Sequence, residues 1–293
     1  MTQARPELSE TVRGALYMMA AMAGFTCNDG FMRITLAEVP LFQAILMRGL
    51  MLTALLLLLQ AIRDGKPRKL ARKDKAIVGL RAVTEMVATI GFMTALLLMP
   101  FANLAAIIQV LPLSVTLAAA VFLKAPIGWR RLMAILIGFG GVMLIIRPDV
   151  NGFNTGSIIA IGIVAIITVR DLSARQLSPQ VSSIRVALIT SVAITGMGGV
   201  GTAYLGWTPM EPWLYAMLLG AALFLVVGYI AAVASMRHGD IAAVTPFRYT
   251  ALIWAIAIGY GVFGERPDLL TLIGIAVIVG TGIFTFYRER QLG

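Results

Sequence analysis

Charged residues divide this chain into long apolar stretches, and the spacing between them predicts its helices. Residues 86–123 carry no charge at all. One straight α-helix of that length would extend roughly 57 Å, whereas the hydrocarbon core of a bilayer is about 30 Å thick. We therefore expect this stretch to fold back on itself, with the turn at residues 99–103.

The same reasoning, applied to the whole chain, predicts ten membrane-spanning helices. They cover residues 13–34, 40–62, 76–98, 102–123, 129–146, 156–176, 181–205, 212–235, 241–263 and 268–287. Helices suit this environment because their backbone groups satisfy one another within the segment. The pattern therefore predicts an all-α polytopic membrane protein with ten transmembrane helices.

Composition excludes the main alternatives to a membrane protein. Of the 293 residues, 59% are hydrophobic and only 13% are charged, against roughly 25% charged in soluble domains. The mean hydropathy of +0.89 is too high for a disordered chain. A single Cys and a single His exclude a disulfide framework and a zinc cluster. We expect no metal and no cofactor.

The net charge of +10 is concentrated in one loop. Seven lysines and arginines lie within residues 63–75, opposed only by Asp64 and Asp74. The positive-inside rule places such a loop in the cytoplasm; a nucleic-acid or lipid-headgroup patch is the less favoured alternative. With an even number of spans, both termini are then cytoplasmic. We expect the bilayer and a small-molecule substrate as partners, and no nucleic acid.

The two halves of the chain resemble each other at an offset near 141 residues. Residues 122–126 align with residues 263–267, and Gly141 aligns with Gly282. Because each half holds five spans, the second half enters the membrane inverted, as in transporters that alternate access around a central site. The predicted repeats are residues 1–148 and 149–293.

Short motifs spread along the chain carry a family resemblance. They are Gly14-Ala15-Leu16, Pro40 with Arg48, Asn103-Leu104-Ala105 with Pro112, residues 137–142, residues 240–246, Phe263-Gly264-Glu265-Arg266-Pro267 and residues 273–277. Together they resemble the EamA family of the drug/metabolite transporter superfamily. One departure is Lys124-Ala125, where the family often has a glutamate.

The resemblance implies both a fold and an activity. The fold is two inverted five-helix bundles around a central cavity, and the activity is alternating-access movement of small metabolites, usually outward. Amino-acid exporters are a large branch of the family. The expected location is a bacterial cytoplasmic (inner) membrane. The sequence leaves the oligomeric state open.

Ionisable residues inside predicted spans are the first candidates for a site, because they are costly to hold there. Arg81 and Glu85 are four residues apart on one helix face. They either line the cavity as a gating or coupling pair or only lock neighbouring helices together. The pairs Asp29–Arg33 and Asp171–Arg175 lie near span ends and favour a structural role. We expect a facilitator, with Glu85 left as a possible proton site.

Polar and aromatic residues suggest how a substrate is held. Thr245, Arg248 and Tyr249 have the spacing of one helix face, with Arg248 placed to bind a carboxylate. This favours neutral amino acids with large apolar or aromatic side chains. The further candidates are the aromatic Phe224, Tyr229 and Trp254 and the uncharged polar Asn28, Thr84 and Gln109. The alternative is that Arg248 snorkels and the others pack or bond helices together.

The main alternative function is a carrier of drugs, nucleotides or sugar derivatives. A membrane enzyme is a remote alternative, because His238 and Ser235 have no third catalytic partner.

Gly24, Pro112, Gly228 and Pro246 are candidate bending points, although membrane helices also tolerate such residues for packing alone.

Overall fold

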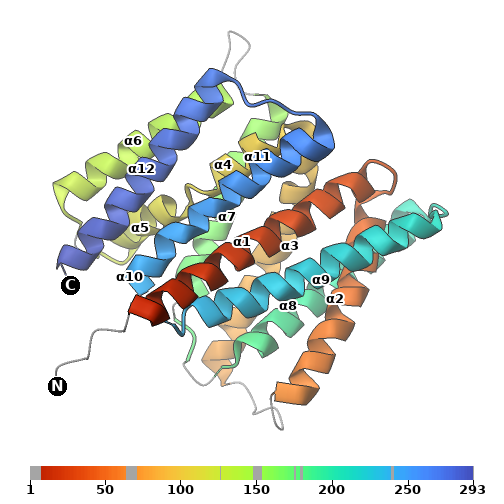
Figure 1. The fold of residues 1–293 in the computed structure, drawn as a ribbon. Helices are drawn as coiled ribbons and strands as arrows, with labels where there is room; N and C mark the ends of the chain where they lie inside the picture. The colour runs from red at the N-terminus through yellow and green to blue at the C-terminus, as the bar shows by residue number, and fades with distance from the viewer. Residues whose placement is uncertain are drawn as a thin grey trace. The chain divides into compact units, whose positions relative to one another are not determined.

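A computed structural model describes residues 8–63, 71–125, 127–147, 154–174, 176–178, 181–238 and 241–292, and all regular secondary structure in these ranges is helical (Figure 1). The helices are α1 (Leu8–Leu36), α2 (Leu41–Arg63), α3 (Arg72–Leu98), α4 (Phe101–Ile108), α5 (Leu111–Phe122), α6 (Trp129–Ile146), α7 (Thr155–Ala174), α8 (Ser183–Leu205), α9 (Pro212–Ser235), α10 (Ile241–Val244), the 3-10 helix η1 (Thr245–Tyr249), α11 (Thr250–Phe263) and α12 (Leu269–Leu292). Most of the basic loop at 63–75 lies outside the described residues.

Eight helical segments of the described chain are long and apolar enough to cross a membrane. They correspond to eight of the ten predicted spans. The first predicted span lies in α1, whose polar residues include Asn28, Asp29 and Arg33. The ninth is divided among α10, η1 and α11, and α11 has only 14 residues. The all-helical membrane class is therefore confirmed, and the count of ten stays a prediction.

The chain forms two compact units, and each unit draws on both predicted repeats. Unit 1 comprises Met1–Cys27, Met99–Ser157 and Val227–Gly293, and unit 2 comprises Asn28–Leu98 and Ile158–Val226. Three boundaries between the units fall within α1, α7 and α9, and the fourth falls between α3 and α4. The compact units are thus assembled from segments far apart in the sequence, and the predicted repeats at 1–148 and 149–293 stay a prediction.

In unit 2, α2 packs along α8. Small residues make the approach possible: a Cβ added to Gly201 would lie 2.3 Å from the ring of Phe42, and one added to Gly198 would lie 2.7 Å from the backbone nitrogen of Leu46. At one end of this pair, the fully buried Gln43 donates to the Thr208 carbonyl at 2.7 Å and accepts from the Thr208 N–H at 2.9 Å. Small side chains and paired polar groups therefore hold α2 against the α8 region.

In unit 1, α6 and α12 run side by side (Figure 1). Their backbones meet at two glycines, because a Cβ added to Gly274 would lie 2.7 Å from the Gly141 carbonyl oxygen and one added to Gly141 would lie 2.9 Å from that of Gly274. Helix α4 packs on α11 in the same unit. The closest helix pairs of the two units thus depend on the same device, a glycine that lets another helix approach.

Two of the predicted spans are interrupted in unit 1. The turn expected at residues 99–103 is confirmed between α3 and α4, but the span that follows is broken again at Gln109 and Val110. Pro112 lies in the first turn of α5, and Pro246 lies in the first turn of η1. Proline supplies no N–H to the preceding helical turn, which explains why the regular α-helix stops at both places.

Candidate functional site

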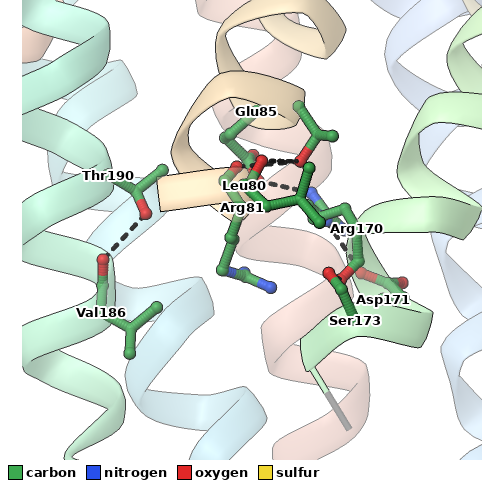
Figure 2. A network of polar contacts seen from close by, with 9 residues as sticks. Leu80, Arg81, Glu85, Arg170, Asp171, Ser173, Val186 and Thr190 are labelled. Carbon is green, nitrogen blue, oxygen red and sulfur yellow. Dashed lines mark hydrogen bonds and ion pairs between the residues drawn. The ribbon is translucent and has the colours of Figure 1, made fainter. Parts of the chain in front are cut away.

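An ion cluster joins α3 and α7 in unit 2. Arg170 Nη1 donates to Glu85 Oε2 at 2.7 Å, and Arg170 Nε donates to Asp171 Oδ1 at 2.8 Å. The side chains of Arg170 and Glu85 are only 18% and 20% exposed. Figure 2 shows them pointing toward each other from the two helices. One guanidinium therefore holds two carboxylates inside segments that are apolar enough to span a membrane.

Arg81 does not form the predicted pair with Glu85. The ion-pair partner of Glu85 is Arg170, which the spacing along α3 alone did not indicate. The Nε of Arg81 is buried and has no hydrogen-bond partner among the described residues. Figure 2 shows the Arg81 side chain beside the cluster, with no contact drawn to its guanidinium. Arg81 therefore places a further positive charge beside the Arg170–Glu85 ion pair.

The hydroxyl groups around the cluster donate hydrogen bonds to backbone carbonyl groups. Thr84 donates to the carbonyls of Leu80 and Arg81 at 2.9 and 3.0 Å, and Ser173 donates to the Arg170 carbonyl at 2.8 Å. The predicted partner of Asp171, Arg175, lies outside the described residues. The substrate-binding role predicted for Thr84 remains untested, but its hydroxyl already has two backbone acceptors.

A second buried polar chain lies between α1 and α2 in unit 2. Arg48 Nη1 donates to Asn28 Oδ1 at 3.3 Å, and Asn28 Nδ2 donates to Asp29 Oδ1 at 2.8 Å. Arg48 is 7% exposed and Asn28 is 3% exposed. The sequence showed no carboxylate near Arg48, because Asp29 comes from another helix. Asn28 is thus the amide that links a buried arginine to a carboxylate.

Gln109 connects the two interrupted spans of unit 1. Its Nε2 donates to the carbonyl oxygen of Arg248 at 2.7 Å, and Gln109 is 5% exposed. Gln109 follows the last residue of α4, and Arg248 lies in η1. One amide side chain therefore supplies a hydrogen bond to the irregular backbone of the other break.

The predicted face of Thr245, Arg248 and Tyr249 has a different geometry. These residues form a 3-10 helix rather than an α-helix. Four residues along, the rotation relative to the start is roughly 40° in an α-helix and 120° in a 3-10 helix, so Tyr249 turns away from Thr245. Tyr249 is 5% exposed, and its hydroxyl would lie 1.7 Å from a Cβ added to Gly282 of α12. The shared α-helical face was wrong, while the binding roles of the three residues remain predictions.

Two of the predicted aromatic residues, Phe224 and Tyr229, make ring contacts. Phe224 stacks on Phe31 in unit 2 with ring centroids 5.6 Å apart, and Tyr229 meets Phe25 edge-on at 5.6 Å in unit 1. Trp254 of α11 is 37% exposed. The structure therefore distributes the predicted binding residues between the two units: Asn28, Thr84, Glu85 and Phe224 in unit 2, and Gln109, Tyr229, Thr245, Arg248, Tyr249 and Trp254 in unit 1.

The four predicted hinge residues fall into two classes. Pro112 and Pro246 lie at helix breaks. Gly24 and Gly228 lie within the unbroken helices α1 and α9, and a Cβ added to Gly228 would lie 2.7 Å from the ring of Phe25. Close packing therefore explains Gly228, and the hinge roles of all four residues stay predictions.

A pocket of about 350 Å³ lies at one end of unit 1 and was not predicted from the sequence. Arg147 and Asp268 form an ion pair in its wall, and Asp268 also accepts the Thr271 N–H at 2.9 Å. The hydrogen bond from Arg147 holds the pKa of the Asp268 carboxyl well below its usual range. Glu265 accepts the Phe101 N–H at 2.7 Å, at the start of α4. The signal available in the sequence was Asp268 itself, a helix-capping residue type just before α12.

The described residues show no group of three or more His, Cys, Asp or Glu side chains placed to hold a metal ion. The chemistry of these clusters is instead that of hydrogen bonds and ion pairs. Such groups can bind the charged ends of a small organic molecule. The most concentrated set is the α3–α7 cluster with Arg81 beside it.

Known transporters are similar to parts of this chain. The S-adenosylmethionine uptake transporter of Rickettsia conorii is 25% identical over 183 residues, which are 62% of this chain and 61% of that protein. The riboflavin transporter of Vibrio cholerae is 23% identical over 187 residues, 64% of this chain and 62% of that protein. The match therefore spans less than two thirds of the length of these relatives.

A structure comparison bears on the fold, and a family comparison bears on the class of protein. A solved crystal structure is similar with a TM-score of 0.64 at 16% identity, over 93% of this chain and 98% of the other, a likeness of fold alone. Residues 12–147 match the EamA-like transporter family. The resemblance found in the sequence is thereby confirmed for this part of the multi-pass membrane protein, whose first half is similar to EamA-like transporters.

Proposed function

We propose that the protein is a bacterial inner-membrane transporter that exports neutral amino acids with large apolar or aromatic side chains by alternating access. The match of residues 12–147 to the EamA-like family supports a transport function. That match ends close to the boundary of the first predicted repeat, which favours a second, inverted copy after it. The proposal includes ten spans and both termini in the cytoplasm.

The observation that carries the substrate class is the charge arrangement in unit 2. A zwitterionic α-amino acid needs one cation for its carboxylate and one anion for its ammonium group. Arg81 offers a guanidinium whose buried Nε has no partner among the described residues, and the carboxylates of Glu85 and Asp171 lie in the adjacent cluster. We assign the substrate carboxylate to Arg81 and the ammonium group to this pair of carboxylates.

The transport experiment uses purified full-length protein in proteoliposomes. The solutes are phenylalanine, leucine, phenylalanine amide, S-adenosylmethionine and riboflavin, each with and without a pH gradient. A charge-assisted hydrogen bond contributes about 1.5–3 kcal/mol, so Arg81→Gln should weaken apparent affinity for phenylalanine about tenfold or more and affect the amide less. Arg13→Gln, which changes an exposed arginine, is the matched control. Equal losses for acid and amide would contradict the assignment.

Arg248→Gln belongs in the same assay. It tests the alternative carboxylate position predicted from the sequence, next to Tyr249. If Arg248→Gln discriminates between acid and amide and Arg81→Gln does not, the substrate carboxylate meets η1 rather than α3. The two variants therefore choose between two sites without changing the proposed substrate class.

The relatives favour a second candidate, uptake of S-adenosylmethionine. That compound also carries an α-amino carboxylate group, so the same charges can serve it, whereas the named direction of the relatives is inward. Transport of S-adenosylmethionine without transport of phenylalanine or leucine would select this candidate. In intact cells, uptake raises the internal pool of the substrate and export lowers it.

Topology is tested separately. Reporters inserted in the loop at 63–75 and fused after residue 293 should both report a cytoplasmic location, since that loop is strongly basic. A periplasmic signal at either position would overturn the ten-span arrangement. It would leave the EamA-like domain itself unaffected.

A further inference from the structure

An apolar groove lies between α6 and α12 in unit 1. It encloses about 350 Å³, and its lining includes Met133, Ile137, Gly280 and Phe284. A Cβ added to Gly280 would meet nothing within 4 Å, so the groove is open where this glycine lies. Met133, Ile137 and Phe284 are 47%, 52% and 41% exposed. This surface therefore has room for an apolar chain laid against it.

One end of the groove is positively charged. Helix α6 begins at Trp129, and the guanidinium of Arg130 lies 5.4 Å from the centroid of the Trp129 ring. The next arginine, Arg131, donates instead to the Thr116 hydroxyl at 3.2 Å. No acidic residue lies in the first turn of α6, whose free backbone N–H groups also favour an anion. Arg130 and the start of α6 thus form a site for negative charge beside an apolar groove.

The depth of this end fits a lipid headgroup. Tryptophan is enriched where hydrocarbon meets headgroups, and Trp129 is 71% exposed. The same end of α6 is on the predicted cytoplasmic side, where anionic lipids attract basic residues.

We propose that this groove binds an anionic phospholipid, with an acyl chain along Met133 and Gly280 and the phosphate at Arg130. The occupant must combine a long apolar part with a negative charge at one end. A second copy of this chain is less suitable, because a two-fold interface would bring the same basic surface to both sides. The lipid satisfies both the apolar lining and the charge.

Native mass spectrometry of the full-length protein in detergent tests the proposal. Phosphatidylglycerol is the anionic probe and phosphatidylethanolamine, with matched acyl chains, is the zwitterionic one. We expect phosphatidylglycerol to bind with higher affinity, and Arg130→Gln to reduce its affinity about tenfold, to the level of phosphatidylethanolamine. Arg266→Gln is the matched control, because Arg266 also lies over an aromatic ring, Tyr260, at 5.6 Å.

A second variant tests the groove itself. Gly280→Leu places a side chain into open space, so it should leave thermal stability unchanged and reduce binding of both lipids. Unchanged phosphatidylglycerol binding in Arg130→Gln, or unchanged binding of both lipids in folded Gly280→Leu, would overturn the proposal. A two-chain species that persists after lipid removal and is lost in Gly280→Leu would assign the groove to a second copy instead.

Discussion

The two units place polar groups among apolar helices in different ways. In unit 2, α3 and α7 are unbroken helices, and their polar groups are charged side chains. Arg170 forms ion pairs with Glu85 and Asp171. In unit 1, the helices are interrupted at Pro112 and Pro246, and the bond that joins the breaks is uncharged, from Gln109 to the Arg248 carbonyl. Buried charges require partners on neighbouring helices, whereas a helix break requires a donor for its backbone.

This difference separates two kinds of sensitivity. An ion cluster loses stability when one charge is removed, because the remaining charges are left in the interior without compensation. A helix break loses stability when its hydrogen bond or its packing is lost, and the cost is then the desolvation of one neutral group. Unit 2 should therefore show the largest single-residue effects.

Arg170→Met should have the largest effect on stability. It leaves Glu85 without its ion-pair partner. Because the two side chains are partly buried, 18% and 20% exposed, the cost should lie below the value of about 3–5 kcal/mol for a fully buried pair. The thermal denaturation midpoint in detergent measures the loss. The double variant Glu85→Leu with Arg170→Met should recover much of it, since both charges then leave the interior. A double variant as unstable as the single one would show that packing, not charge, joins α3 to α7.

Gly282→Ala should be the most damaging change in unit 1. The added methyl group would overlap the Tyr249 hydroxyl, which lies 1.7 Å from the Cβ position, and overpacking costs about 1–3 kcal/mol. Tyr249→Phe removes a buried hydroxyl that has no hydrogen-bond partner among the described residues, so by itself it should be neutral or stabilising. Combined with Gly282→Ala, it should restore part of the thermal stability. No restoration would mean that the ring itself, rather than the hydroxyl, sets the limit.

Gln109→Leu should have a smaller effect, about 1–2 kcal/mol, because it leaves one backbone carbonyl without this donor. The matched variant is Gln43→Leu in unit 2, which removes two bonds to Thr208 and should cost more. Thermal stability of the two variants compares an uncharged contact in each unit. If Gln109→Leu is equally stable but transports more slowly, the bond serves the motion rather than the fold.

Asp268→Asn should have the smallest effect. Its side chain is 53% exposed and that of Arg147 is 40% exposed, and exposed pairs contribute little. Because the pKa of Asp268 is lowered in the folded protein, its contribution is present above the ordinary carboxyl pKa of about 4 and is lost as the pH falls through the folded value. The difference in thermal midpoint from the unsubstituted protein should therefore shrink below about pH 4. A difference that grows on acidification would contradict this.

The apolar pattern predicted the positions of the helices better than it predicted the contacts between their residues. Residues 86–123 carry no charge, and fold-back at 99–103 followed from length alone. Arg81 and Glu85 show the limit, because a spacing of four residues permits a contact but a guanidinium from α7 competes for the carboxylate. Arg170 was evident beside Asp171 in the sequence, yet its bond to Glu85 depends on how α3 packs against α7.

Pro246 shows a second limit. Its presence indicated a disturbed helix, but not that five residues would adopt a 3-10 conformation. That conformation changes the direction of Tyr249 and buries it against Gly282. The pocket walled by Arg147 and Asp268 was missed because its residues come from loops and helix ends that meet only in the folded unit.

The pairing of α2 with α8 has a consequence for biosynthesis. Thr53 of α2 contacts Thr195 of α8, and 142 positions separate them in the sequence. At about 5–20 residues per second, a ribosome needs roughly 7–28 s to add the second partner after the first. During that interval, the face of α2 that packs against Gly198 and Gly201 of α8 has no partner helix. Newly inserted α2 should therefore be the segment most dependent on insertases or membrane chaperones, and a ribosome stalled before residue 183 should leave it accessible to crosslinking.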